Sequence, residues 1–104
     1  MADLTQEQWA AQLKADPAAS LVDVRTPEEY EEGFIPNARN IDIYKGTHFL
    51  DEVKKLDKSA NYYVYCKSGG RSAQACMLMT QMGFTAYNLL GGYKEWSGET
   101  TLPS

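Results

Sequence analysis

The chain has 104 residues, of which 43% are hydrophobic and 23% charged, a composition typical of a soluble globular protein. This length predicts one domain over residues 1–104 that can bury a core without disulfide bonds. The net charge of −4 argues against nonspecific nucleic-acid binding, and no apolar run is long enough to cross a membrane.

Cysteine and histidine are scarce. The two cysteines and the single histidine, His48, are too few for a disulfide framework or a zinc cluster. The first residues lack the basic region and apolar stretch of a secretory signal. We therefore expect a reduced, cytoplasmic protein with no metal or other cofactor. We expect a monomer, since the chain is small and has no obvious apolar surface stripe.

Helical and strand patterns alternate through the first half of the chain. Two segments, Thr5 to Gln8 and Thr26 to Glu29, have the form of a capping box, which marks the start of a helix. The elements predicted here are, in chain order, a helix over 5–14, a strand over 20–24, a short acidic helix from Thr26 to about Gly33, a strand over 40–43 and a helix over 49–56.

The second half continues the alternation with a clearer strand. Residues 62–66, Tyr-Tyr-Val-Tyr-Cys, are apolar on both faces, as in a central strand of a parallel sheet. A helix over 71–82, a strand over 86–90 and a helical turn near Tyr93 and Trp96 follow. The alternation predicts an α/β fold with a mainly parallel sheet and helices on both faces.

The segment Cys-Lys-Ser-Gly-Gly-Arg-Ser, residues 66–72, lies where the central strand ends and a helix begins. Ligands bind at this edge of parallel sheets. Consecutive glycines permit positive φ angles, so the amides can turn inward and form an anion nest before the helix. We expect this nest, with the cations Lys67 and Arg71, to lower the pKa of the Cys66 thiol. The alternative is that Cys66 is a small core residue at the end of a buried strand.

The Cys-x-x-Gly-x-Arg-Ser pattern of residues 66–72 resembles the active-site loop of rhodanese-like sulfurtransferases. Two further segments are similar to the N-terminal and C-terminal signatures of that family. The first is Leu21 to Arg25 with Glu28-Glu29-Tyr30 and the turn from Gly33 to Ala38, and the second is Gly91 to Trp96. The three segments occur in the family's order and cover nearly the whole chain.

This resemblance implies a rhodanese-like, five-stranded fold and a sulfurtransferase. Cys66 would take a sulfane sulfur from thiosulfate, a persulfide or a polysulfide, and pass it to a thiol or cyanide. The guanidinium of Arg71 could bind the anionic group of the donor. Lys67 stands where the family commonly has arginine and lacks the bidentate fork, which weakens the case for thiosulfate in particular. The substrate-binding residues implied are Lys67, Ser68, Gly69, Gly70, Arg71 and Ser72.

Two other functions stay open. A sulfur-relay or binding module would share the fold, and a relay, whose partner is a protein, would use the same persulfide with a different acceptor. Cysteine-based phosphatases and arsenate reductases form a second class, and the phosphatase loop has five residues between its cysteine and arginine. Here four residues separate Cys66 from Arg71. A tighter ring of amides suits the single terminal sulfur of a persulfide, so loop length favours sulfur.

Three other residues could carry chemistry, but each has a more ordinary interpretation. Cys76 is expected to be a buried core residue rather than a resolving thiol. His48 is expected in an exposed loop with Gly46 and Thr47. Arg25 is expected to pair with Glu29 or a neighbouring carboxylate and to fix the turn after its strand.

Overall fold

The computed structural model describes residues 2–103, and within this range the chain forms one five-stranded sheet. The strand order is β1-β5-β4-β2-β3, and each neighbouring pair is parallel. The strands are β1 (Ala2–Leu4), β2 (Ala19–Asp23), β3 (Arg39–Asn40), β4 (Asn61–Tyr65) and β5 (Thr85–Leu89). The predicted α/β fold with a parallel sheet is confirmed.

The four α-helices begin within two residues of their predicted starts. Both capping boxes form, with the side chains of Thr5 and Thr26 accepting hydrogen bonds from the backbone amides three residues later. The α-helices are α1 (Gln6–Ala15), α2 (Pro27–Glu31), α3 (Thr47–Lys54) and α4 (Gly70–Gln81). Two short 3₁₀ helices, η1 (Ile43–Lys45) and η2 (Tyr93–Glu95), complete the described part of the chain. Within residues 2–103 no helix has the length and apolar character needed to span a membrane.

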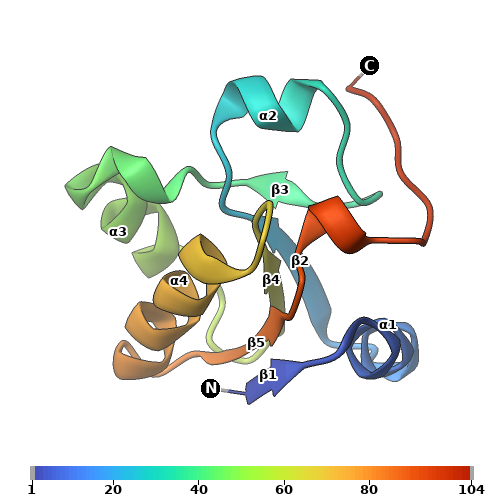
Figure 1. The fold of residues 1–104 in the computed structure, drawn as a ribbon. Helices are drawn as coiled ribbons and strands as arrows, with labels where there is room; N and C mark the ends of the chain where they lie inside the picture. The colour runs from blue at the N-terminus through green and yellow to red at the C-terminus, as the bar shows by residue number, and fades with distance from the viewer. Residues whose placement is uncertain (1, 104) are drawn as a thin grey trace.

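The sheet separates two buried clusters (Figure 1). Helices α3 and α4 cover one face, and α1 lies on the other. Successive residues of β4 point to opposite faces, so Tyr62 and Val64 pack toward α3 and α4, whereas Tyr63 and Tyr65 pack with Trp9 of α1. The prediction that the central strand is buried on both faces is therefore confirmed.

Three details differ from the prediction. The strand expected over 40–43 is only the two-residue β3, because Asp42 accepts a hydrogen bond from the Tyr44 amide and starts η1. The edge strand β1 was not predicted, since three residues carry too little pattern to mark a strand. His48 lies within α3 rather than in a loop, although it is exposed as expected.

Candidate functional site

Cys66 directly follows β4 and lies at the carboxyl edge of the sheet, and the loop after it leads into α4 (Figure 1). Its Sγ accepts a hydrogen bond from the Gly69 amide at 3.1 Å and lies 3.4 Å from the Ser72 hydroxyl. Gly69 has a φ of +103°, which turns this amide toward the sulfur. Gly70 is already the first residue of α4, so only one of the two glycines uses the positive φ expected for both.

The environment of Cys66 favours its thiolate, even though the residue is buried. Burial by itself raises the pKa of the thiol. Hydrogen bonds from the side chain and amide of Ser72, and from the amides of Gly69 and Ser68, outweigh burial, so the pKa of Cys66 is lowered. The direction agrees with the sequence prediction, and the amides before α4 contribute to it as an anion nest does.

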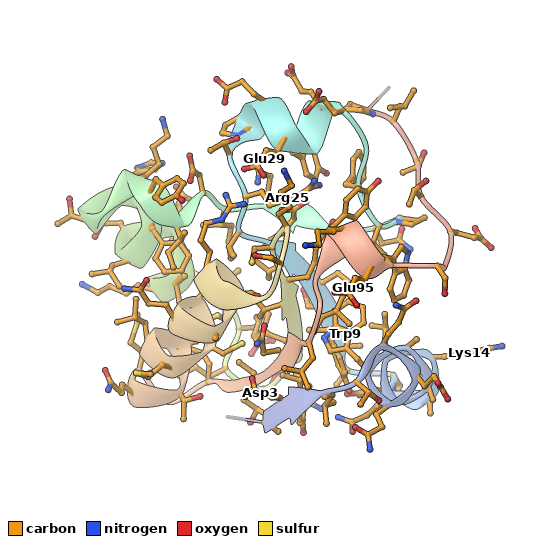
Figure 2. All side chains as sticks on the ribbon, in the orientation of Figure 1. Asp3, Trp9, Lys14, Arg25, Glu29 and Glu95 are labelled. Carbon is orange, nitrogen blue, oxygen red and sulfur yellow. The ribbon has the colours of Figure 1, made fainter. Side chains whose placement is uncertain are left out.

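Arg71 is held by an ion pair. Its Nη1 and Nη2 atoms donate to the two carboxylate oxygens of Glu29 at 2.7 and 2.9 Å. This pair joins the first turn of α4 to α2, and Figure 2 shows Glu29 beneath α2, at the carboxyl edge of the sheet. In this structure the guanidinium therefore fixes the loop against α2 and uses two of its five N–H groups on Glu29. That Arg71 also binds the anionic group of a donor stays a prediction.

Arg25 has the structural role expected of it, and its partner is a neighbouring carboxylate, that of Asp23, rather than Glu29. The Nη2 atom of Arg25 lies 2.6 Å from the Asp23 carboxylate and donates to the Gly33 carbonyl at 2.7 Å. Its guanidinium lies 4.3 Å from the centre of the Tyr93 ring. Arg25 and Asp23 are both buried, so this pair ties the end of β2 to the turn at Gly33.

The segment after β5 is bound to the start of the cysteine loop by backbone hydrogen bonds. The amides of Tyr93 and Lys94 donate to the carbonyls of Cys66 and Lys67 at 2.8 and 2.9 Å. Gly92, whose φ is +63°, packs so closely that a Cβ there would lie 2.5 Å from the Lys67 carbonyl oxygen. The sequence marked this segment as a signature but gave it no role, because its contact with the loop joins residues far apart in the chain.

A buried polar residue of β5 completes the surroundings of the sulfur. Asn88 is 1% exposed, and its Oδ1 lies 2.5 Å from the Ser72 hydroxyl. Its Nδ2 donates to Asp3 of β1 at 2.9 Å and to the Gly69 carbonyl at 3.3 Å. Sequence reasoning missed Asn88, and the signal that could have identified it is an amide within an otherwise apolar strand.

Cys76 lies in α4 and is buried in the same cluster as Cys66. Burial, followed by the negative charge of Asp3, raises the pKa of Cys76 to about 12. Its thiol is therefore protonated near neutral pH and is a poor nucleophile. Among residues 2–103 there is also no group of three His, Cys, Asp or Glu side chains that could hold a metal ion.

Arg71 and Glu29 each line one of two hollows. One, of about 380 Å³, is lined mainly by apolar residues of η1, α3 and α4 together with Arg71. The other, of about 210 Å³, is lined by Lys67 and Lys94, with Arg25, Glu29, Glu32 and Tyr93. The Lys67 and Lys94 residues are exposed, so the second hollow offers two ammonium groups next to the cysteine loop.

The ion pair with Arg71 predicts how acid affects stability. Hydrogen bonds from Arg71 lower the pKa of Glu29 to about 2, against an ordinary 4.5, although burial opposes the shift. A carboxyl with a lowered pKa in the folded state contributes stability above its unfolded pKa, and this contribution disappears as pH falls toward 2. We expect Glu29→Gln, which can still form the capping box, to lower stability at pH 7 by about 1–2 kcal/mol, a value reduced by solvent screening.

Urea unfolding of the two proteins between pH 7 and pH 2.5 would measure this difference. It should shrink steadily below about pH 4.5, because the carboxyl of Glu29 takes up a proton in the unfolded chain before it does so in the folded protein. The exposed neighbour Glu28 provides the control, since Glu28→Gln should change stability by less than about 0.5 kcal/mol. A difference that does not depend on pH would show that the ion pair is not its source.

Comparison with known proteins places these features in a family. Residues 6–99 match the family model described as "Rhodanese-like domain". A sulfurtransferase of Allochromatium vinosum is 32% identical over 97 residues, covering 91% of this chain and 87% of that protein. The thiosulfate sulfurtransferase PspE of Escherichia coli is 35% identical over 80 residues, covering 71% of this chain and 70% of that one. The crystal structure of a rhodanese-like domain protein from Staphylococcus aureus superimposes with a TM-score of 0.86, covering 100% of both chains at 31% identity.

Proposed function

The chain belongs to the rhodanese-like domain family, and we propose that it is a sulfurtransferase that carries a sulfane sulfur as a persulfide on Cys66. The observation that carries this proposal is the environment of the Cys66 sulfur. The sulfur accepts a hydrogen bond from the Gly69 amide at 3.1 Å, just before α4 begins. Donors arranged in this way lower the pKa of a thiol and stabilise negative charge on sulfur. Two relatives that bear sulfurtransferase names support the same class of reaction.

The reaction has two steps, written here for thiosulfate as donor. The Cys66 thiolate attacks the outer sulfur of thiosulfate, a new sulfur–sulfur bond forms, and the old one breaks with its electron pair leaving on sulfite. The enzyme then carries Cys–S–S⁻. In the second step a thiolate or cyanide attacks the outer sulfur, which leaves as a persulfide or thiocyanate and restores the Cys66 thiolate. Each step moves one sulfur atom and conserves charge.

Different residues of the loop contact the cysteine sulfur and the donor. The amides of Ser68, Gly69 and Ser72 hold the charge on the cysteine sulfur. We assign the anionic end of the donor to Lys67 and Lys94, because these exposed cations line one hollow, whereas two of the five N–H groups of Arg71 are bound to Glu29. Gly70 has nothing within 4 Å of its missing Cβ, which leaves space beside the loop. Because Cys66 is fully buried, the groups that cover its sulfur have to move before the donor can reach it.

The acceptor can be a small thiol, cyanide or the cysteine of a relay protein, since each would attack the same outer sulfur. Phosphoryl transfer is the competing chemistry, and it would begin from the same thiolate. Four residues between Cys66 and Arg71 form a smaller ring of amides than the five-residue phosphatase loop. Hydrolysis also needs a positioned acid for the leaving group. The loop length therefore favours sulfur over phosphorus.

Intact-mass measurement of the wild-type protein tests the assignment. Incubation with thiosulfate should add the mass of one sulfur atom, and cyanide should remove it. The same preparation should hydrolyse an aryl phosphate no faster than buffer. No mass gain with thiosulfate, polysulfide or a small persulfide as donor, or robust phosphatase activity, would refute the proposal.

A further inference from the structure

A single hydroxyl proton lies among three acceptors beside the Cys66 sulfur. The Ser72 oxygen is 2.5 Å from Asn88 Oδ1, 3.2 Å from the Gly69 carbonyl and 3.4 Å from Cys66 Sγ. A serine hydroxyl has one proton to donate, so it serves these acceptors one at a time. Both Ser72 and Asn88 are buried, so the direction of this proton affects the energy of the site.

The orientation of Asn88 decides which acceptor receives the proton. Its Nδ2 faces two acceptors, the Asp3 carboxylate at 2.9 Å and the Gly69 carbonyl at 3.3 Å. If the amide were turned over, its oxygen would face both of these acceptors without a proton between them. Oδ1 therefore faces Ser72, and because Oδ1 carries no proton, the short contact requires the proton of Ser72.

We propose that Asn88 is a positioning residue that draws the Ser72 proton away from Cys66 and so restrains formation of the thiolate, while Asp3 holds Asn88 in the required orientation. With the thiol present, Cys66 donates to the Ser72 oxygen and Ser72 donates to Asn88. When the thiol loses its proton to solvent, Ser72 turns its own proton to the sulfur. The buried Oδ1 atom of Asn88 then lacks a donor, which makes ionisation less favourable.

Other charged and titratable groups also act on the sulfur. Arg71 and Cys76 of α4 interact with it electrostatically, Lys67 follows it in the loop, and Asp3 of β1 accepts a hydrogen bond from Asn88. Asn88 is neutral, so replacing it with a neutral residue leaves these charges in place. Such a change therefore tests competition for the proton separately from long-range electrostatics.

A neutral substitution at Asn88 separates this role from that of a loop anchor. Asn88→Ala is neutral and removes both the acceptor that faces Ser72 and the donor to the Gly69 carbonyl. The rate of alkylation of Cys66 by iodoacetamide, followed against pH, should show a midpoint lower by about one unit in Asn88→Ala. If Asn88 only anchors the loop, the loss of the anchor loosens the amides around the sulfur and raises the midpoint. A raised or unchanged midpoint in Asn88→Ala would therefore show that the proposal is wrong.

Repeating the substitution in a Ser72→Ala protein tests whether the shift in the alkylation midpoint depends on Ser72. Ser72→Ala should raise the midpoint because it removes a donor to the thiolate, and adding Asn88→Ala should then produce no decrease. A decrease of the same size without Ser72 would overturn the proposal. Should Asn88→Ala fail to fold, Asn88→Val, a residue favoured in strands, carries the same expectation. The inference rests on the proposed function only because it takes the Cys66 thiolate as the attacking group. Alkylation measures the pKa of Cys66 directly, so it tests the inference even if the protein takes up no sulfur.

Discussion

Replacing Cys66 with serine is expected to abolish sulfur uptake, whereas the same change at Cys76 should leave most of it. Serine has nearly the size of cysteine and can accept a hydrogen bond from the Gly69 amide, but its oxygen cannot form a persulfide. Cys76 is buried and the pKa of its thiol is raised to about 12, so it contributes little thiolate near neutral pH. Intact mass after incubation with thiosulfate measures the uptake in each variant.

The control must allow for lost stability. Cys76→Ser places a hydroxyl in an apolar cluster at a cost of about 1–3 kcal/mol, so uptake should be normalised to the folded fraction. Equal loss of uptake in the two folded variants would contradict a single-cysteine mechanism. It would indicate that both thiols take part, with Cys76 receiving sulfur from Cys66 or resolving its persulfide.

Local pattern was sufficient to predict most of the fold and the place of Cys66 at the carboxyl edge of the sheet. The signals used were short-range: the two capping boxes, the strand before Cys66 that is apolar on both faces, and the Gly-Gly turn. Each of them predicted a helix or strand to within about two residues of its observed bounds. The exception, residues 40–43, had a strand pattern that the cap at Asp42 overrode. Helix caps and strand patterns compete over a few residues, and the sequence alone does not say which prevails.

The site was predicted less completely because its contacts join distant parts of the chain. Glu29 illustrates this point. The sequence placed it in the capping box of a short acidic helix and offered it as a partner of Arg25. Its Oε1 does accept a hydrogen bond from the Thr26 amide. The same carboxylate also pairs with Arg71, 42 positions later, which no local pattern reveals. Asn88 and Asp3 are similar, since they meet only when β1 pairs with β5.

The largest structural effect is expected at Gly92. An alanine Cβ there would lie 2.5 Å from the carbonyl oxygen of Lys67 and 2.7 Å from that of Cys66. Both are backbone atoms, so neither can move aside as a flexible side chain would. The two amides that follow Gly92 also hold these carbonyls, which means that relief of the collision breaks the support of the loop. We expect Gly92→Ala to lower the free energy of unfolding by about 4 kcal/mol or more and to abolish sulfur uptake.

Gly46 supplies the matched control for this substitution. Its φ of +57° is close to the +63° of Gly92, but nothing lies within 4 Å of its missing Cβ. Gly46→Ala therefore carries backbone strain without a collision, and we expect it to cost about 1–2 kcal/mol and to leave sulfur uptake intact. Urea unfolding measures the stability of both variants, and intact mass measures their uptake. If the two variants lose equal stability, strain at positive φ accounts for the whole effect and the contact with the cysteine loop contributes nothing.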